Sequence, residues 1–215
     1  MQQLKFYFSI LFLLAQINAS KAQTKLFVKT DMGLSSMRYR PAIAMGGRFG
    51  YGLGIETVLS LKSVSNKFQY LTFNPSLSFV KTAYSLYVAN AANSNVVAKY
   101  MRLDLPLMQT LIADRPGREF FLGAGPYLAL PVGGHFTEAS TRYKMRYGNT
   151  SASNRRGNDM GLVFKLTATH FLNTDIRCSL QYNYGLNNLV PKYYNPNDIR
   201  IRSRNIYLSF AFPLN

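Results

Sequence analysis

Alternation of apolar and polar residues is the feature that most limits what this chain can fold into. In residues 205–212, Ile206, Leu208, Phe210 and Phe212 occupy every second position. Successive side chains of a β-strand point to opposite faces, so this pattern predicts a strand with one apolar face. The same pattern recurs in eight stretches, which are 25–34, 42–61, 68–80, 100–107, 120–130, 159–168, 175–186 and 205–212. We therefore expect an all-β fold built from eight strands.

The lengths of the strands and of their links favour a transmembrane barrel. Many of the stretches are ten residues or longer, whereas strands of soluble proteins average five or six. About ten residues suit a tilted strand that crosses a bilayer. The links alternate between a longer class, near 35–41 (short for this class), 88–98, 134–157 and 189–202, and a shorter class, near 62–67, 112–118 and 172–175. This predicts an eight-stranded antiparallel up-and-down barrel, with both termini at the short-turn, periplasmic rim.

The first 22 residues have the layout of a cleaved secretory signal peptide. A lysine precedes the apolar run 6–15, and Ser20 and Ala22 occupy the −3 and −1 positions of a small-residue cleavage site. The apolar run is too short for the roughly 20 residues of a transmembrane helix. We expect residues 1–22 to be the signal and residues 23–215 to form a single barrel domain.

The composition of the chain limits the kinds of molecule that it can bind. The chain has 215 residues with 25 Lys+Arg against 9 Asp+Glu, a formal charge of +16. Only 16% of the residues are charged, below the roughly 25% that is typical of soluble domains. A secreted protein does not meet nucleic acid, so the positive charge needs another partner. The single cysteine, Cys178, excludes an intramolecular disulfide and a cysteine-based metal cluster. No cofactor is expected.

The polar face of the strands indicates which side points inward. It is rich in Gly, Ser, Asn, Thr and Ala, with isolated charges of both signs, whereas a soluble barrel would cover its outer face with Lys and Glu. Such residues suit the lumen of an eight-stranded barrel, which side chains just fill. The apolar face then meets lipid. The expected lumen charge network comprises Lys29, Asp31, Arg48, Glu56, Arg102, Asp104, Lys165 and Arg177. The opposite orientation would give a soluble, lipocalin-like barrel that binds an apolar ligand.

Few residues are candidates for catalysis. The two histidines, His135 and His170, are expected at opposite ends of the barrel, too far apart to share a metal or a proton. A lipid-modifying enzyme at the rim would use His135 with Ser140 or Glu138, although only their proximity in sequence supports it. A solvated loop histidine is the favoured interpretation, and no enzymatic activity is expected. Cys178, on the lipid face, is expected to act as a small hydrophobic residue.

Basic residues in the longer links indicate a function more clearly than the histidines do. On the outer leaflet, they would form charge-assisted contacts with lipopolysaccharide phosphates. The candidates for these contacts are Arg142, Lys144, Arg146, Arg155, Arg156, Lys192, Arg200 and Arg202. The alternatives are a solvated loop whose charges matter only for topology, and a dedicated ligand or envelope protein partner.

Four motifs in order carry a resemblance to a known family. They are RLDLPL at 102–107, FFLGAGPYLALPVGG at 120–134, LQYNYGLNNLVP at 180–191 and NIYLSFAFPLN at 205–215. In these motifs the chain resembles the PorT-like outer-membrane β-barrel family of Bacteroidota. The resemblance implies an eight-stranded barrel with no established general enzymatic activity, and some relatives take part in protein secretion. The chain ends in Pro213-Leu214-Asn215 rather than in an aromatic residue, which departs from the commonest outer-membrane C-terminus.

From these observations we expect an integral protein of the cell outer membrane without catalysis. Its expected role is structural, adhesive or accessory to an envelope complex, and its partners are outer-membrane lipids and lipopolysaccharide.

Overall fold

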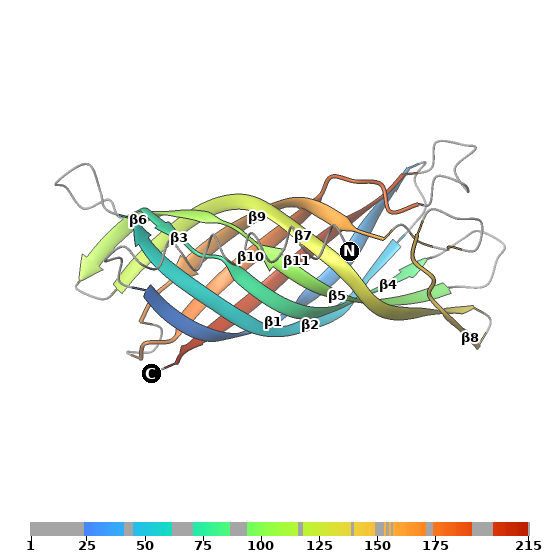
Figure 1. Ribbon diagram of the computed structural model, residues 1–215, viewed down its shortest axis with the longest axis horizontal. Helices are drawn as coiled ribbons and strands as arrows, with labels where there is room; N and C mark the ends of the chain where they lie inside the picture. The colour runs from blue at the N-terminus through green and yellow to red at the C-terminus, as the bar shows by residue number, and fades with distance from the viewer. Residues whose placement is uncertain are drawn as a thin grey trace, which may run out of the picture.

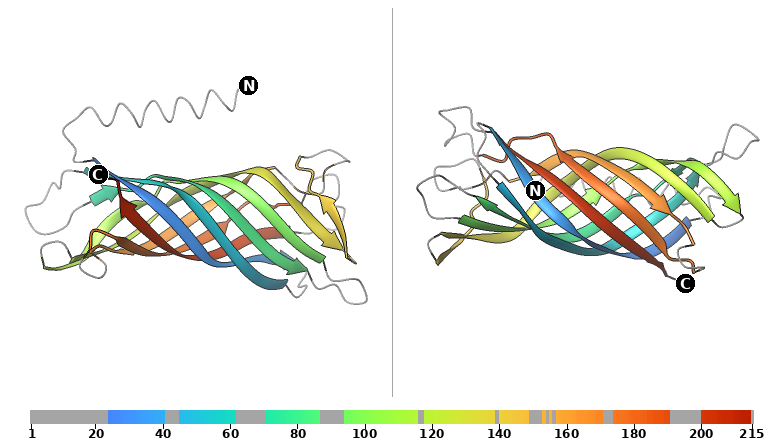
Figure 2. Two further views of the ribbon diagram at one scale, coloured as in Figure 1. Left: turned by 90° about the horizontal axis from the view of Figure 1, so that it is seen from below. Right: turned by 180° about the vertical axis from the view of Figure 1, so that it is seen from behind.

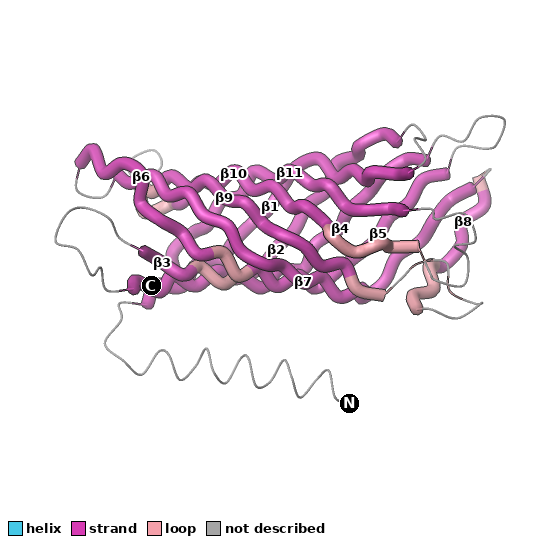
Figure 3. Tube along the Cα trace, turned by 90° about the horizontal axis from the view of Figure 1, so that it is seen from above, coloured by secondary structure: helices cyan, strands magenta, loops and turns pink. Residues whose placement is uncertain are grey.

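The computed structural model describes residues 24–40, 45–61, 71–86, 94–115, 118–138, 140–148, 153, 155, 157–170, 174–190 and 200–214. The expected signal peptide lies outside these residues. The regular structure in them is all strand (Figure 3). The strands are β1 (Thr24–Arg40), β2 (Met45–Leu61), β3 (Leu71–Phe73), β4 (Ser76–Leu86), β5 (Ser94–Asp104), β6 (Leu107–Arg115), β7 (Arg118–Glu138), β8 (Thr141–Lys144), β9 (Asp159–Ala168), β10 (Arg177–Gly185) and β11 (Arg200–Pro213).

The antiparallel sheet closes on itself. Starting from β1, each strand pairs with the next in the order β2, β4, β5, β7, β9, β10 and β11, and β11 pairs again with β1. Figures 1 and 2 show these strands tilted around a long barrel axis. We call the end with Thr24 and Pro213 the terminus end, and the end with β8 the loop end. No helix in the described ranges is long and apolar enough to cross a membrane.

The described sheet has eleven strands, three more than the expected eight, and prolines explain two of the additions. Pro75 separates β3 from β4, and Pro106 separates β5 from β6. Proline has no N–H to donate, so the regular ladder is interrupted there. The two separated segments, β3 and β6, still pair with each other at the terminus end. The backbone N–H of Asn74 donates a hydrogen bond of 3.0 Å to the carbonyl oxygen of Pro106, so the two interrupted positions remain side by side. The third addition, β8, pairs only with the end of β7.

The strands extend further towards the loop end than their apolar alternation indicated. Residues 35–41 and 134–138 were expected in links, but β1 continues to Arg40 and β7 to Glu138. The 21 residues of β7 span about 70 Å at ~3.3 Å per residue, more than twice the thickness of a bilayer core. Backbone pairing needs no apolar face, so the ladder continues where the alternation has ended.

The two faces of the barrel have opposite chemistry. The outer face is apolar, and on it Leu180 is 52% exposed and Leu208 is 39% exposed. The inner face is polar, and Lys165 and Arg177 are only 2% and 4% exposed. Cys178 lies on the outer face, half-buried, opposite Phe210 in the register. At these positions the apolar residues therefore point outward and the charged residues inward, as the strand composition predicts.

One glycine on the inner face has a clear packing reason. Gly161 lies opposite Tyr127 in the register of β7 and β9. A Cβ atom added at Gly161 would lie 2.8 Å from the ring of Tyr127 and would also collide with the carbonyl oxygen of Tyr184. The absence of a side chain at this position lets the tyrosine ring occupy the lumen.

Candidate functional site

The middle of the lumen holds a neutral cluster of two cations and two anions. We call it the Asp31 cluster. Arg102 on β5 bridges two carboxylates, donating from Nη2 to Asp31 at 2.9 Å and from Nε to Asp104 at 3.0 Å. The Nζ of Lys29 lies 3.3 Å from Asp31 and donates to Gln181 at 3.0 Å. All five side chains are buried. Since opposite charges and hydrogen bonds compensate their burial, the cluster fills the lumen with a fixed polar structure.

A second cluster lies nearer the terminus end, and we call it the Glu56 cluster. Glu56 on β2 accepts a hydrogen bond from Nζ of Lys165 on β9 and another, of 2.8 Å, from Nη1 of Arg177 on β10. The carboxylate is 1% exposed, so both cations depend on it inside the barrel. This cluster has two positive charges and one negative charge, whereas the Asp31 cluster has two of each.

Seven of the eight residues expected in the lumen network lie in these two clusters, and Arg48 does not. The side chain of Arg48 is exposed. It lies opposite Ser35, towards the loop end, in the part of β2 where the register with β4 shifts between Gly47 and Tyr51. Regular alternation places Arg48 on the same face as Glu56, but at this level, nearer the loop end, its side chain remains exposed, and the buried ion pairs lie farther along the barrel.

Arg155 enters the barrel instead of projecting from its rim. It is 4% exposed, and its Nη1 donates to the hydroxyl of Tyr84 at 2.7 Å. Its guanidinium lies 5.5 Å and 5.7 Å from the ring centres of Tyr84 and Tyr100. This arrangement is a desolvated cation–π contact. The prediction that Arg155 contacts lipopolysaccharide is therefore wrong, because aromatic rings hold the cation inside the lumen.

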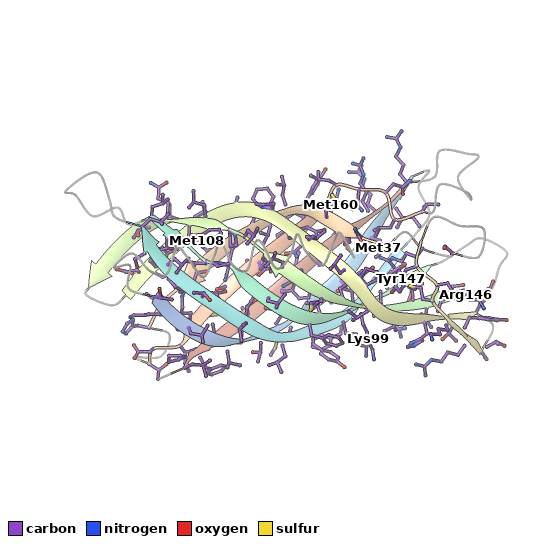
Figure 4. All side chains as sticks on the ribbon, viewed as in Figure 1. Met37, Lys99, Met108, Arg146, Tyr147 and Met160 are labelled. Carbon is purple, nitrogen blue, oxygen red and sulfur yellow. The ribbon has the colours of Figure 1, made fainter. Side chains whose placement is uncertain are left out.

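Apolar side chains close the lumen around Arg155. Met145 and Leu189, both from segments between strands, are buried in a cluster with Met37 and Tyr100. The hydroxyl of Tyr147 donates to the Gly133 carbonyl at 2.9 Å. Figure 4 labels Met37 and Tyr147 near this end of the barrel. Side chains thus occupy the lumen at the loop end as well as at the two ion clusters.

The other basic candidates are divided between the surface and the part of the chain that is not described. Arg142 and Lys144 on β8, Arg146 and Arg200 are exposed, and Arg202 is half-buried. The remaining two, Arg156 and Lys192, lie outside the described residues. The register brings Arg38 opposite Arg202, a neighbour that sequence reasoning missed. The same two-residue alternation, continued past the apolar part of β1, would have found Arg38.

The two histidines lie at opposite ends of the barrel. His135 is in the last part of β7, and its Nδ1 lies 3.0 Å from Nη2 of Arg142. Partial burial and the neighbouring cations, Arg142 first among them, lower the pKa of His135. His170 follows β9 at the terminus end, where its Nε2 lies 3.0 Å from Asp175. Ser140 has a left-handed φ of 71° in the turn before β8. This geometry assembles neither histidine with a nucleophile, and the described residues hold no group of three ligands for a metal.

A cavity of about 300 Å³ opens at the terminus end. Polar and aromatic side chains line it, among them Lys25, Phe27, Glu119, His170 and Arg177. The Arg177 guanidinium lies 5.4 Å from the Phe27 ring centre and also reaches the Glu56 cluster. The Glu56 cluster therefore lies at the inner end of this cavity.

The comparisons with known proteins find similarity in structure only. No family model matches the chain, and no curated protein matches its sequence. Its structure is similar to that of the Neisserial surface protein A, with 13% identity over 88% of this chain and 97% of that chain, at a TM-score of 0.47. It is also similar to Ail, the attachment invasion locus protein of Yersinia pestis, with 8% identity over 87% and 98% of the two chains, at a TM-score of 0.37. A structure of Ail with the heparin analogue sucrose octasulfate gives 9% identity over 88% and 99%, at a TM-score of 0.41.

Proposed function

We propose that the protein is an integral β-barrel of the cell outer membrane, with a structural, adhesive or accessory role in an envelope complex. The observation that carries this proposal is the inverted distribution of side chains. Large apolar residues such as Phe79 and Leu180 are half exposed on the outer face, while Lys165 and Glu56 are buried inside. An outer face of this kind suits hydrocarbon, and a closed sheet satisfies the backbone groups of its strands without an exposed edge.

The same observation weighs against a soluble, lipocalin-like binder. Such a protein needs an apolar cavity for its ligand and a charged outer face in water. Here the Asp31 cluster, the Glu56 cluster and Arg155 occupy the lumen. Free conduction of solutes is not part of the proposed function for the same reason.

Fractionation of cells tests the membrane location. The protein should sediment with the outer membrane, resist release by osmotic shock and dissolve only in detergent. A folded barrel should also migrate differently on a gel before and after boiling. Recovery of the folded protein in the osmotic-shock fluid, without detergent, would overturn the proposal.

We further propose that the protein is of the PorT-like type and that its loop end faces lipopolysaccharide. In support, the exposed basic residues Arg142, Lys144 and Arg146 follow one another at this end, where they can approach phosphates from outside. A protein partner in the envelope is the alternative. Purification from detergent-solubilised envelopes distinguishes them, since it recovers either lipopolysaccharide alone or a stoichiometric protein complex.

A non-catalytic role completes the proposal. The contact between His135 and the Arg142 guanidinium supports it, because a nearby cation makes the imidazole a weaker base. His135→Ala should leave the mass spectrum of lipid A unchanged. A modification of lipid A that disappears in this variant would instead establish a lipid-modifying enzyme at the rim.

A further inference from the structure

Four arginines line a small cavity on the outer wall at the loop end. The cavity measures about 140 Å³ and is lined by Arg38, Tyr184, Arg200, Arg202 and Arg204. Strands β1, β10 and β11 contribute these residues. They occupy the alternating positions that continue the outward, apolar face of each strand, so the cavity faces the surroundings of the barrel and not its lumen.

The cavity begins where the apolar face of the barrel ends. In the register of β1 and β11, Leu34 lies opposite Ile206, and both are exposed on the outer face. Two residues further along, Arg204 lies opposite a serine, and after two more Arg38 lies opposite Arg202. The basic positions therefore follow directly above an apolar surface on the same two strands. In a barrel that spans a membrane, this is the level of the lipid headgroups.

One of the four cations is held rigidly. The Arg204 guanidinium stacks on the ring of Tyr184 at 3.5 Å from its centre. Its Nη1 donates to the carbonyl oxygens of Gly185 at 2.9 Å and Ser203 at 2.7 Å. A guanidinium fixed in this way loses little further freedom when it binds an anion.

The charges of the cavity are not neutralised within the described part of the chain. The ion pairs there involve Lys29, Arg102, Lys165 and Arg177, and none of the four arginines of the cavity. The Nε of Arg202 is buried and has no hydrogen-bond acceptor. Like charges directly opposite each other on neighbouring strands are destabilising. A bound anion would reduce the repulsion between these guanidinium groups and would accept a hydrogen bond from the Nε of Arg202.

We propose that this cavity binds the phosphate group of a lipid in the outer leaflet, with the acyl chains of that lipid along Leu34 and Ile206. Guanidinium groups match phosphate geometry through paired N–H donors, and Arg202 has an N–H that needs an acceptor. The continuity with the apolar face selects a membrane lipid over an anion free in solution. The assignment rests on the proposed membrane location.

Native mass spectrometry of the intact barrel in detergent tests the assignment. The barrel is mixed with phosphatidic acid, a phosphate monoester, and with phosphatidylcholine in equal amounts. The wild-type protein should retain one phosphatidic acid in preference to phosphatidylcholine. The double variant Arg38→Gln/Arg202→Gln should bind phosphatidic acid about tenfold more weakly, or weaker still, because it removes charge-assisted hydrogen bonds.

A matched control separates a specific site from general positive charge. Lys81→Gln/Lys99→Gln removes the same number of charges from two lysines that lie opposite each other on β4 and β5, outside the cavity. This variant should retain phosphatidic acid as the wild type does. Equal losses in both double variants, or undiminished retention in Arg38→Gln/Arg202→Gln, would overturn the site.

Competition with inorganic phosphate distinguishes a lipid from a soluble anion. Inorganic phosphate at the concentration of the lipid should not displace phosphatidic acid, because it lacks acyl chains. Displacement would overturn the lipid assignment and leave a site for free phosphate. Folding of each variant is checked by its gel mobility before boiling. If the wild type proves soluble without detergent, the membrane location itself fails, and that result is independent of lipid retention.

Discussion

Replacing Glu56 by glutamine tests whether the lumen depends on its buried ion pairs. Glu56 accepts from Lys165 and, at 2.8 Å, from Arg177, and the three side chains are 1%, 2% and 5% exposed. Glutamine keeps the shape of the side chain but not its charge. The variant therefore leaves two cations inside the barrel without their anion.

The expected cost follows from the burial of these charges. Removing one partner of a buried pair costs about 3–5 kcal/mol in the free energy of unfolding, since the remaining charge stays desolvated. The pair of His170 and Asp175 offers a matched control, because its side chains are 41% and 74% exposed. Asp175→Asn should cost less than about 1 kcal/mol, as expected for a pair in water.

Unfolding by urea in detergent micelles measures both variants. The chain has no tryptophan, so far-ultraviolet circular dichroism is the suitable signal. Should Glu56→Gln fold poorly, Glu56→Gln/Lys165→Gln is expected to recover part of the stability, because it removes one of the two unpaired cations. A Glu56→Gln variant as stable as Asp175→Asn would refute the reasoning, as would a double variant that is less stable than Glu56→Gln.

Three further predictions concern the outer face, the loop end and the packing of the lumen. Leu180→Lys should lower the free energy of unfolding in lipid vesicles by about 2–4 kcal/mol, and a neutral effect there would argue against lipid contact. Arg155→Ala should speed hydrogen exchange at the Met145 amide, which donates to a backbone carbonyl at 3.0 Å, and unchanged exchange would mean that Arg155 does not hold this segment. Gly161→Ala should lower the free energy of unfolding in urea by about 1–3 kcal/mol. Gly133→Ala should lower it much less, because no atom lies within 4 Å of the added Cβ. Equal effects of the two substitutions would contradict the packing argument.

Much of the fold was predictable from local sequence. Residues 159–168 were expected to form one strand, and β9 has these bounds. The predicted faces of β11 are also confirmed, with Leu208 outward and Ser209 inward. The boundaries at the loop end were less accurate, since β1 and β7 continue past their alternating segments. The prolines that divide two of the expected strands were visible in the sequence, but their effect on the ladder depends on the neighbouring strands.

The candidate site was only partly predictable. The sequence identified charged residues on the inner face, but not their partners, and it placed Arg48 among them. Arg155 was expected at the surface because a basic residue in a long link usually remains in water. Its burial depends on Tyr84 and Tyr100, which come from other strands and supply both a hydroxyl and aromatic faces.

By itself, the sequence determined where the strands run and which face of each is apolar, because a strand repeats every two residues and this period is local. Only the tertiary structure decided which charges meet. Arg102 and Asp31 are 71 positions apart, and Arg177 and Glu56 are 121 apart. Their contacts arise from the closure and register of the sheet, as does the row of arginines that faces outward from β1 and β11. Closure and register depend on all the strands together, and no single segment carries that information.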